Sequence, residues 1–565
     1  MKRSLPTHLR GLSSQVKKWL LISIGSLLFI LFIYPSAFIY PRDTLPDNND
    51  TRLIAYIIGQ VQQNILKHQP LHYGTFFSPN QNTLAYSDLF LTSAVLTLPF
   101  HLITDSPARN AFRIADAGGP IVIFNLALVL GFLLTILASY LLFEYLLTDT
   151  WLTFLAVILF NFSGFHLHYL AHLQAFSLWP LLLALYFFLR FQKENRSLFL
   201  ILYFCLVTVQ LAESIFPVYL LFFATLTLLP SSPARIILAG QLKKIISFSL
   251  PFIPIWIFLL YPYAHLHFSL PEATRPIRDA AHFSLGLDQI FTQFHSWTVI
   301  VIFLISGVAR VLLGNYPQEQ KRGIFLKKKN FCDEAKTAAK SWLSGLWFPK
   351  KYTGESRKTN WLLIFLFSII MSLGPVLKIF GANIRISGFP IPLPYTLFYY
   401  LFPGFTGFRT PSRFIILALL ATVVLIGFNL KPTFAKLKPK TKFIFLLLIL
   451  SLLFIEADLP LTGYPVNINM HPVYSEVKKL PPEAVILELP IKLWNMPDHE
   501  IESIRSLYSL QHSHRRFGGF SGFATNKWIN LVEAINAHGL NPENISDLKA
   551  LGITHVISNN QLSPL

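Results

Sequence analysis

The stretch YPRDTLPDNNDTRLI (residues 40–54) places three aspartates, Asp43, Asp47 and Asp50, directly after an apolar run. The whole chain of 565 residues contains only 28 acidic residues, so a cluster of three is unusual. The run before it, residues 19–40, is long enough to cross the roughly 30 Å of hydrocarbon in a bilayer. We therefore expect the aspartates at a membrane–water boundary, where a first transmembrane helix ends.

The composition is typical of a membrane protein. Hydrophobic residues make up 53% of the chain and charged residues 13%, and the mean hydropathy is +0.50. Soluble domains carry about 25% charged residues, whereas lipid accommodates a largely apolar surface. Two cysteines, Cys205 and Cys332, are too few for a disulfide framework, so we expect free thiols. The first apolar run is longer than the core of a cleaved signal peptide, and we expect it to remain.

Apolar runs with the length of membrane spans recur along the chain, and we count about eleven. They are residues 19–40, 120–147, 150–165, 174–190, 197–212, 215–230, 245–263, 296–313, 361–380, 412–429 and 443–457. Residues 87–103 are ambiguous, because they fit either a twelfth span or an amphipathic helix lying in the interface.

Basic residues between the runs predict the orientation. Lysines and arginines precede the first run and follow the fourth and sixth; residues 314–360 hold eleven against four acids, and residues 430–442 hold five lysines and no acid. With eleven spans all of these segments fall on one side, which the positive-inside rule makes cytoplasmic. A twelfth span would break the agreement, so we place 87–103 on the membrane surface. The net charge of +19 is then a topology signal, and we expect no nucleic-acid partner.

The expected fold class is an α-helical polytopic membrane protein with the N-terminus inside and the C-terminus outside. Residues 1–457 would form the transmembrane domain, with a long first outer loop (41–119), and residues 458–565 a small extracytoplasmic α/β domain. Within this tail, EAVILELP (483–490) and ITHVIS (553–558) read as strands. NPENISDLKALG reads as a helix with an N-terminal asparagine cap followed by proline.

The first outer loop has two interpretations. PRDTLPDNND is rich in turn-forming residues, and Asp50 could simply cap an amphipathic helix from Thr51 to His68. Long ordered outer loops, however, are often functional. The residues alone leave both interpretations open.

Several short motifs occur in a fixed order. They are the aspartate pair with a leucine (Asp47, Asp50, Leu53), FFSPN…LAYSD (76–88), H.Q….WPL (172–181, with His172, Gln174, Trp179, Pro180 and Leu181), FR.PSRF (408–414), LELP (487–490) and LGITHV (551–556). In this order the chain resembles the GT-C membrane glycosyltransferases, which include protein O-mannosyltransferases and bacterial aminoarabinose transferases. It is most similar to a loose set of uncharacterised bacterial YfhO-like multi-pass proteins.

This resemblance implies a transferase of the bacterial inner (plasma) membrane. Such an enzyme moves a sugar from a polyprenyl-phosphate-linked donor to a glycan, lipid or protein acceptor on the outer face. A carboxylate takes the proton of the acceptor hydroxyl, a role for Asp50 with Asp47 as the alternative. Arg409 and Arg413 would hold the donor phosphate, unless they only reach toward the membrane interface. No cofactor is expected, although a divalent metal remains open.

Four further residues are candidates for lining the cavity. His172 and Gln174 lie near an outer helix end, together with two other histidines at i, i+2, i+6 spacing, which does not share one helical face; we predict no metal site there. Glu213 either lines the cavity or caps the next helix. Asp88, after Ser87, looks more like a helix cap.

Two other functions compete with transfer. A transporter or flippase for a lipid-linked glycan would need polar residues in the middle of several spans, and only Asn125 and Gln210 stand out. A non-catalytic envelope-assembly protein with the same fold would need none of the candidate chemistry.

Overall fold

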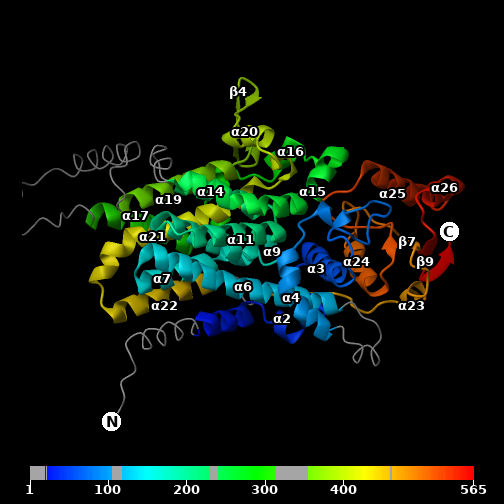
Figure 1. Cartoon of the computed structure of the whole chain (residues 1–565), viewed down its shortest axis with the longest axis horizontal. Helices are drawn as coiled ribbons and strands as arrows, with labels where there is room; N and C mark the ends of the chain where they lie inside the picture. Colours follow the sequence, from blue (N-terminus) through cyan, green and yellow to red (C-terminus); the bar gives the residue numbers. More distant parts are fainter. Residues whose placement is uncertain (1–19, 21, 105–117, 230–239, 314–353, 458–460) are drawn as a thin grey trace, which may run out of the picture.

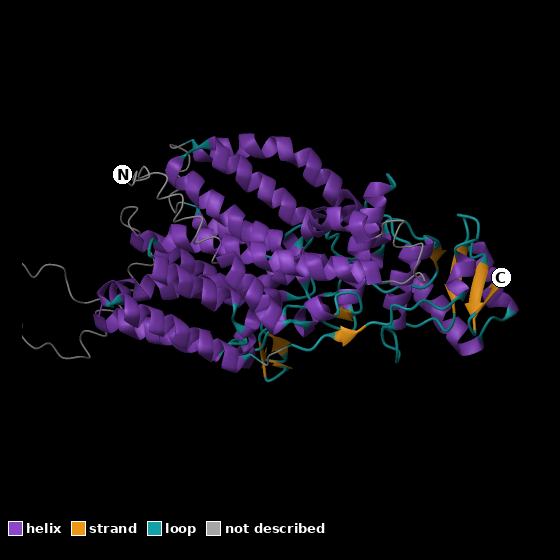
Figure 2. Ribbon diagram, turned by 90° about the horizontal axis from the view of Figure 1, so that it is seen from below, coloured by secondary structure: helices purple, strands orange, loops and turns teal. Residues whose placement is uncertain are grey.

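The computed structural model describes residue 20 and residues 22–104, 118–229, 240–313, 354–457 and 461–565. Long helices run side by side along one axis, and a small sheet near the C-terminus lies at one end of them (Figures 1 and 2). Cys332 and the basic residues of 1–19 and 314–353 lie outside the described residues. Cys205 is a free, exposed thiol.

Each of the eleven apolar runs coincides with helical structure. The first contains the helical residues Ile22–Ile33; the others overlap with α6 (Gly118–Leu147), α7 (Thr150–Asn161), α10 (Trp179–Glu194), α11 (Ser197–Glu213), α12 (Phe216–Leu228), α14 (Gln241–Ser249) with α15 (Ile253–Ser269), α17 (Trp297–Leu313), α19 (Gly354–Ser372), α21 (Ile415–Lys436) and α22 (Pro439–Glu456). Five segments within the described residues are long and apolar enough to cross a membrane: 118–147, 150–168, 173–194, 241–269 and 411–436. The number eleven stays a prediction.

Shorter elements connect these helices. They are α2 (Ser36–Ile39), β1 (Thr44–Leu45), η1 (Thr83–Tyr86), α8 (Gly164–His168), α9 (Leu173–Phe176), η2 (Leu250–Phe252), η3 (Pro271–Ala273), α16 (Ile277–His282), η4 (Leu287–Gln289), η5 (Thr292–Phe294), β2 (Lys378–Ile379), β3 (Ala382–Asn383), β4 (Arg385–Ile386), β5 (Phe389–Pro390), α20 (Pro394–Leu401), η6 (Phe405–Gly407) and η7 (Pro411–Phe414).

Helix α6 fixes which segments lie at which end of the bundle. Near its start, Asn125 Nδ2 donates to the carbonyls of Pro41 (3.1 Å) and Thr44 (3.0 Å), which belong to the aspartate segment. At its other end, Lys431 Nζ from α21 donates to the carbonyl of Leu147 (2.9 Å). With 30 residues α6 is about 45 Å long, at 1.5 Å per residue. The aspartates and the basic turn after α21 are therefore at opposite ends.

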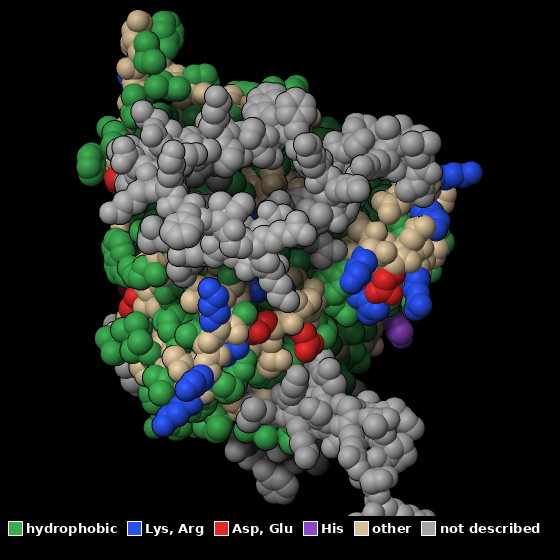
Figure 3. All heavy atoms as spheres, turned by 90° about the vertical axis from the view of Figure 1, so that its left-hand side faces the viewer, with side chains coloured by type: hydrophobic (Ala, Val, Ile, Leu, Met, Phe, Trp, Pro, Cys, Tyr) green, Lys and Arg blue, Asp and Glu red, His purple; other side chains and the backbone are tan. Residues whose placement is uncertain are grey.

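Other basic turns lie with Lys431. Tyr145 near the end of α6 donates to the carbonyl of Leu189 (3.2 Å) in α10, and Lys244 at the start of α14 donates to Asn195 Oδ1 (3.1 Å). Figure 3 looks at this end and shows lysine and arginine side chains on a largely hydrophobic surface, with fewer acidic ones. The described basic turns thus share one end, as the loop charges predicted.

Helix α3 (Asp50–Leu66) corrects one expectation about the first outer loop. We expected an amphipathic, interfacial helix from Thr51 to His68, but the buried residues of α3 run almost without a break from Thr51 to Asn64. It packs against α6 and α4 (Leu91–Thr104), and against α24 (Ile501–His512) of the tail. Helix α24 of the tail thus helps to bury α3, and the sequence pattern alone does not show this contact. Helix α4, the ambiguous segment, has 14 residues and contains Pro99.

The tail contains a four-stranded sheet of order β10-β9-β7-β8. Its strands are β7 (Val485–Glu488), β8 (Arg515–Arg516), β9 (His555–Ser558) and β10 (Gln561–Pro564); β7 runs parallel to β8 and β9, and β9 and β10 form an antiparallel hairpin. The other elements are β6 (Tyr464–Pro465), α23 (Val473–Val477), α25 (Asn526–His538) and α26 (Pro542–Ala550). Both expected strands are confirmed, and Asn541 caps α26 by accepting from Asn544 N (2.8 Å).

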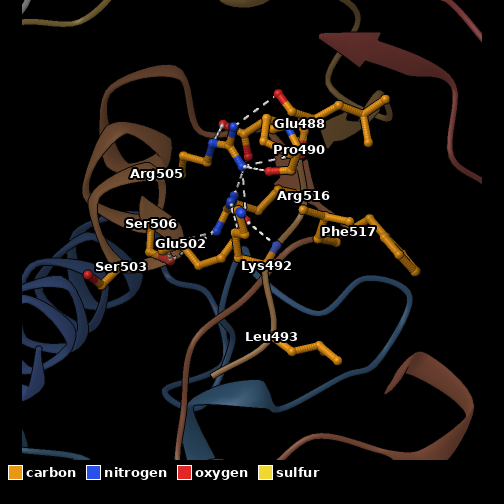
Figure 4. A network of polar contacts seen from close by, with 12 residues as sticks. Glu488, Pro490, Lys492, Leu493, Glu502, Ser503, Arg505, Ser506, Arg516 and Phe517 are labelled. Carbon is orange, nitrogen blue, oxygen red and sulfur yellow. Dashed lines mark hydrogen bonds and ion pairs between the residues drawn. The ribbon is translucent and has the colours of Figure 1, made fainter. Parts of the chain in front are cut away.

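A buried charge network joins the sheet to α24 (Figure 4). Arg516 on β8 donates to Glu488 Oε2 (2.6 Å) on β7 and to Glu502 Oε2 (2.7 Å) on α24. Arg505 binds the other oxygen of Glu502 (2.9 Å). Burial opposes ionisation of Glu488, but the two arginines and Tyr474 overcome it and lower its pKa to about 2. Each charge is paired, which a buried ion requires.

The tail is bonded to the first outer loop along α3. Gln63 Nε2 donates to the carbonyl of Leu510 (2.8 Å), and the hydroxyls of Thr75 and Ser509 are 2.7 Å apart. The backbone of Arg516 exchanges bonds with the loop, donating to Thr75 O (2.7 Å) and accepting from Ser78 N (3.0 Å). Through α24 and β8, the charge network thus also fixes the loop that carries the aspartates.

The two ends of the bundle give a topology prediction. A reporter enzyme that is active only outside the cytoplasm should be active when fused after Leu565. A second reporter, active only in the cytoplasm, should be active when inserted between Leu437 and Lys438, because the basic turns are expected inside. The opposite pattern of activities would reverse the assignment of the aspartates to the outer face.

Candidate active site

Asp47 and Asp50 have different surroundings. Asp47 Oδ1 accepts from the backbone N–H groups of Thr51 (2.9 Å) and Asn49 (3.1 Å) and from the hydroxyl of Thr51 (2.7 Å). The expectation that Asp50 caps a helix from Thr51 is wrong, since α3 already begins at Asp50 and Asn49 is the N-cap position. Asp47 supplies the carboxylate that the first turn needs.

Asp50 points instead toward a histidine. Its Oδ2 lies 3.5 Å from His172 Nδ1, and the Asp50 side chain is 49% exposed. Within the described residues no protein N–H or O–H donates a hydrogen bond to it. A half-exposed carboxylate with one imidazole neighbour is available to a reacting group, and catalytic hydrogen bonds are often long before a substrate binds.

His172 lies on the short connection between α8 and α9. Burial lowers its pKa, and Arg413 lowers it further, while Asp50 and Asp47 act in the opposite direction. Burial thus favours the neutral form of the imidazole. The segment is held closely: a Cβ on Gly164, at the start of α8, would lie 2.0 Å from the carbonyl oxygen of His295. Only glycine permits this approach of the two loops.

The two arginines of FRTPSRF, Arg409 and Arg413, have different neighbours. Arg413, on η7, stands over the ring of Phe216 (5.9 Å) and acts electrostatically on His172 and on Asp88. Arg409 is exposed, stands over Phe283 (5.2 Å) and lies close enough to Arg275 to lower the pKa of that guanidinium, after burial. Of these two arginines, only Arg413 acts on His172, the neighbour of Asp50.

Asp88 and Glu213 each accept a hydrogen bond at the start of the helix that follows the other carboxylate in the sequence. Glu213, at the end of α11, accepts from the backbone N–H (2.8 Å) and hydroxyl (2.6 Å) of Ser93 in the first turn of α4. Asp88, just before α4, accepts from Ile215 N (3.3 Å) at the start of α12. Capping of the helix that follows was one of two interpretations for Glu213 and the favoured one for Asp88, but each caps the helix that follows the other carboxylate. The exchange is a correction, and it gives both side chains a structural task.

Gln174 is on α9 and only 8% exposed. Its Oε1 is buried, and it has no hydrogen-bond partner among the described residues. A buried acceptor without a partner is costly, so this position is consistent with the polar lining that the sequence suggests.

The described residues contain no group of three or more His, Cys, Asp or Glu side chains arranged to hold a metal ion. His168, one of the three histidines of the segment, stacks instead on His295, with ring centres 4.1 Å apart. These two rings and Glu456 line a cavity of about 480 Å³. Glu456 accepts from the hydroxyls of Ser296 and Thr298 (both 2.8 Å). Sequence reasoning missed His295 and Glu456, whose only signal was their place near outer helix ends.

Comparison with known proteins gives a fold but no family. No protein-family model and no curated protein matches the chain. Among solved structures the chain is similar to the arabinofuranosyltransferase AftD from mycobacteria, with a TM-score of 0.51, 14% identity, and coverage of 96% of this chain and 35% of that one. The chain thus spans about a third of that protein's length. At this identity the likeness shows a common overall fold and no more.

A second similar structure is ArnT from Cupriavidus metallidurans. It aligns over 96% of this chain and 95% of its own, at 11% identity and a TM-score of 0.34, a score that does not show a common fold.

The contrast between the two aspartates predicts different responses to substitution. Asp47→Ala should cost about 0.5–2 kcal/mol of stability, because the first turn of α3 loses its acceptor. Asp47→Asn keeps an oxygen and should recover most of that loss. At Asp50 the Ala and Asn variants should unfold alike. Thermal unfolding of the four purified variants measures this; a large difference between the Asp50 variants would give Asp50 the capping role.

Proposed function

We propose that the chain is a membrane glycosyltransferase with Asp50 as its base, acting on a polyprenyl-phosphate-linked sugar at the outer face of the membrane. The observation that carries the proposal is the placement of Asp50, His172 and Arg413 together at the end of the bundle where the tail is docked. Support for the reaction class comes from the AftD-like fold, whose namesake transfers arabinofuranose.

The proposed reaction is a single displacement. The acceptor hydroxyl oxygen attacks the anomeric carbon, its proton passes to the Asp50 carboxylate, and the bond from that carbon to the phosphate oxygen breaks. The polyprenyl phosphate leaves with the bonding electron pair, and the configuration at the anomeric carbon inverts. Such a base must stand where a lipid-linked donor and a water-soluble acceptor meet, as the first turn of α3 does.

His172 and Arg413 have supporting roles in this scheme. The neutral imidazole fixes the direction of the Asp50 carboxylate and is a positioning residue. Arg413 supplies a permanent positive charge beside that pair, suited to the phosphate of the leaving group. Arg409, which we also expected at the donor phosphate, lies over Phe283 and is given no role in the reaction.

Replacing Asp50 tests the base directly. Asp50→Asn keeps the shape of the side chain but cannot take a proton, so the transfer rate should fall by about 10²–10⁴. Asp47→Asn is the matched control and should stay within a few-fold of wild type, because it keeps the cap. The measurement is consumption of synthetic polyprenyl-phosphate sugars by protein in nanodiscs. Wild-type rates in folded Asp50→Asn, or no consumption by the wild type, would remove the proposal.

The two arginines give a second test with an internal control. Arg413→Ala should raise the donor KM about ten-fold or more, since a hydrogen bond to a charged group contributes about 1.5–3 kcal/mol. Arg409→Ala removes the same charge from the same motif and should change the donor KM little. Substitutions of exposed residues usually change the free energy of unfolding by no more than about 0.5 kcal/mol. Equal effects of the two substitutions would show that Arg413 acts only through the overall positive charge of this surface.

A further inference from the structure

Two consecutive β-hairpins follow α19. The first pairs β2 with β3 around Phe380 and Gly381, and the second pairs β4 with β5 around Ser387 and Gly388. All four turn residues have positive φ, between 47° and 83°, the backbone of the tight two-residue turn that matches strand twist. Each strand has only two residues. An isolated hairpin this short is only marginally stable in water. Its faces therefore need to pack against something else.

Large apolar side chains cover the outside of this unit. Phe380 is 83% exposed, Phe389 77% and Ile386 66%. Helix α20, which follows directly, adds Leu401 (72%) and Tyr400 (68%). The segment 379–401 contains no acidic residue and one basic residue, an arginine. Apolar patches of this kind on a soluble surface mark an interaction site.

The base of the hairpins is held firmly to the bundle. Lys378 is 8% exposed, and its ammonium group donates to the carbonyls of Ala281 (2.6 Å) and Ser284 (2.7 Å). Phe380 N donates to Asp288 Oδ1 (2.8 Å). These hydrogen bonds fix the base of the hairpins on the bundle. The exposed aromatic rings therefore point in a fixed direction.

That direction is across the helices and not along them. In Figure 1 the hairpin carrying β4 projects from the side of the bundle, level with the helices and clear of the end that carries the tail. Figure 3 shows the same projection at the top, as a narrow, mainly hydrophobic column. A segment that extended into the outer aqueous space would instead continue the helix direction beyond the helix ends.

We infer that the unit formed by residues 378–401 is inserted sideways into the outer leaflet of the bilayer. The eleven-span topology leaves residues 381–411 on the outer side, between the ninth and tenth apolar runs. Exposed apolar side chains of the same kind occur on the long apolar helix α15, where Ile257 is 61% and Phe258 62% exposed. Arg385, the one charged residue of the segment 379–401, donates to the carbonyl of Gly388 (3.3 Å), and its long side chain suits the negative phosphates of lipid headgroups.

The insertion is tested with a fluorescent label at Phe389. A Phe389→Cys variant, made after replacing Cys205 and Cys332 by serine, carries an environment-sensitive dye and is reconstituted in phosphatidylcholine liposomes. Nitroxides on the lipid acyl chains should quench the dye several-fold more strongly than they quench a dye at Trp494→Cys. Trp494 is a matched control, because it is 72% exposed and lies in the tail. Aqueous iodide should show the reverse order.

Two results would overturn the inference. Equal quenching by iodide at positions 389 and 494 would place the hairpin in water. Shielding at 389 that disappears when the liposomes hold less than one protein each would identify a second copy of this chain as the partner. A Phe380→Cys variant repeats the test on the first hairpin, in case the dye at 389 disturbs the second. None of these outcomes depends on transferase activity.

Discussion

The burial of α3 between the helix bundle and the tail is the constraint on which the rest of the structure depends. Helices α6 and α4 cover it from the bundle, and α24 covers it from the tail. At Gly59 the packing is so close that a Cβ would lie 2.9 Å from Leu510 Cδ1. Burying one large apolar side chain contributes about 1.5–3 kcal/mol. With several such side chains on α3, its first turn, and Asp50 with it, has a fixed position relative to both parts.

The same helix shows why its surroundings could not be predicted from the sequence. Its polar residues suggest a water-facing side, yet Gln62 donates to Ala94 O (3.0 Å) and Thr97 Oγ1 (2.9 Å) of α4. Asn64 donates to the carbonyl of Tyr73 (2.7 Å) in the following loop. Hydrophobic periodicity in the sequence indicates that a helix has a polar side. It does not indicate whether water or a protein carbonyl forms hydrogen bonds with that side.

Local signals were reliable where both partners lie close in sequence. The apolar runs became helices, β7 and β9 formed at the expected residues, and Asn541 caps its own helix. The carboxylates were misjudged because their partners are distant: Glu213 is bonded to Ser93, 120 residues away, and Asp88 to Ile215, 127 residues away. The pairing of Asp50 with His172 has the same character, and no motif spacing encodes it.

These distant contacts also decide which boundary carboxylate can act as a base. Asp47, Asp88 and Glu213 each accept a backbone N–H at a helix start. Taking up a proton would remove the charge that holds that N–H, so proton transfer to any of them would also weaken a helix terminus. Among the described residues the Asp50 carboxylate accepts no backbone N–H and has the His172 imidazole beside it, so it can gain and lose a proton while these helix ends stay bonded. Of these four carboxylates, Asp50 is thus the one on which no hydrogen bond at a helix start depends.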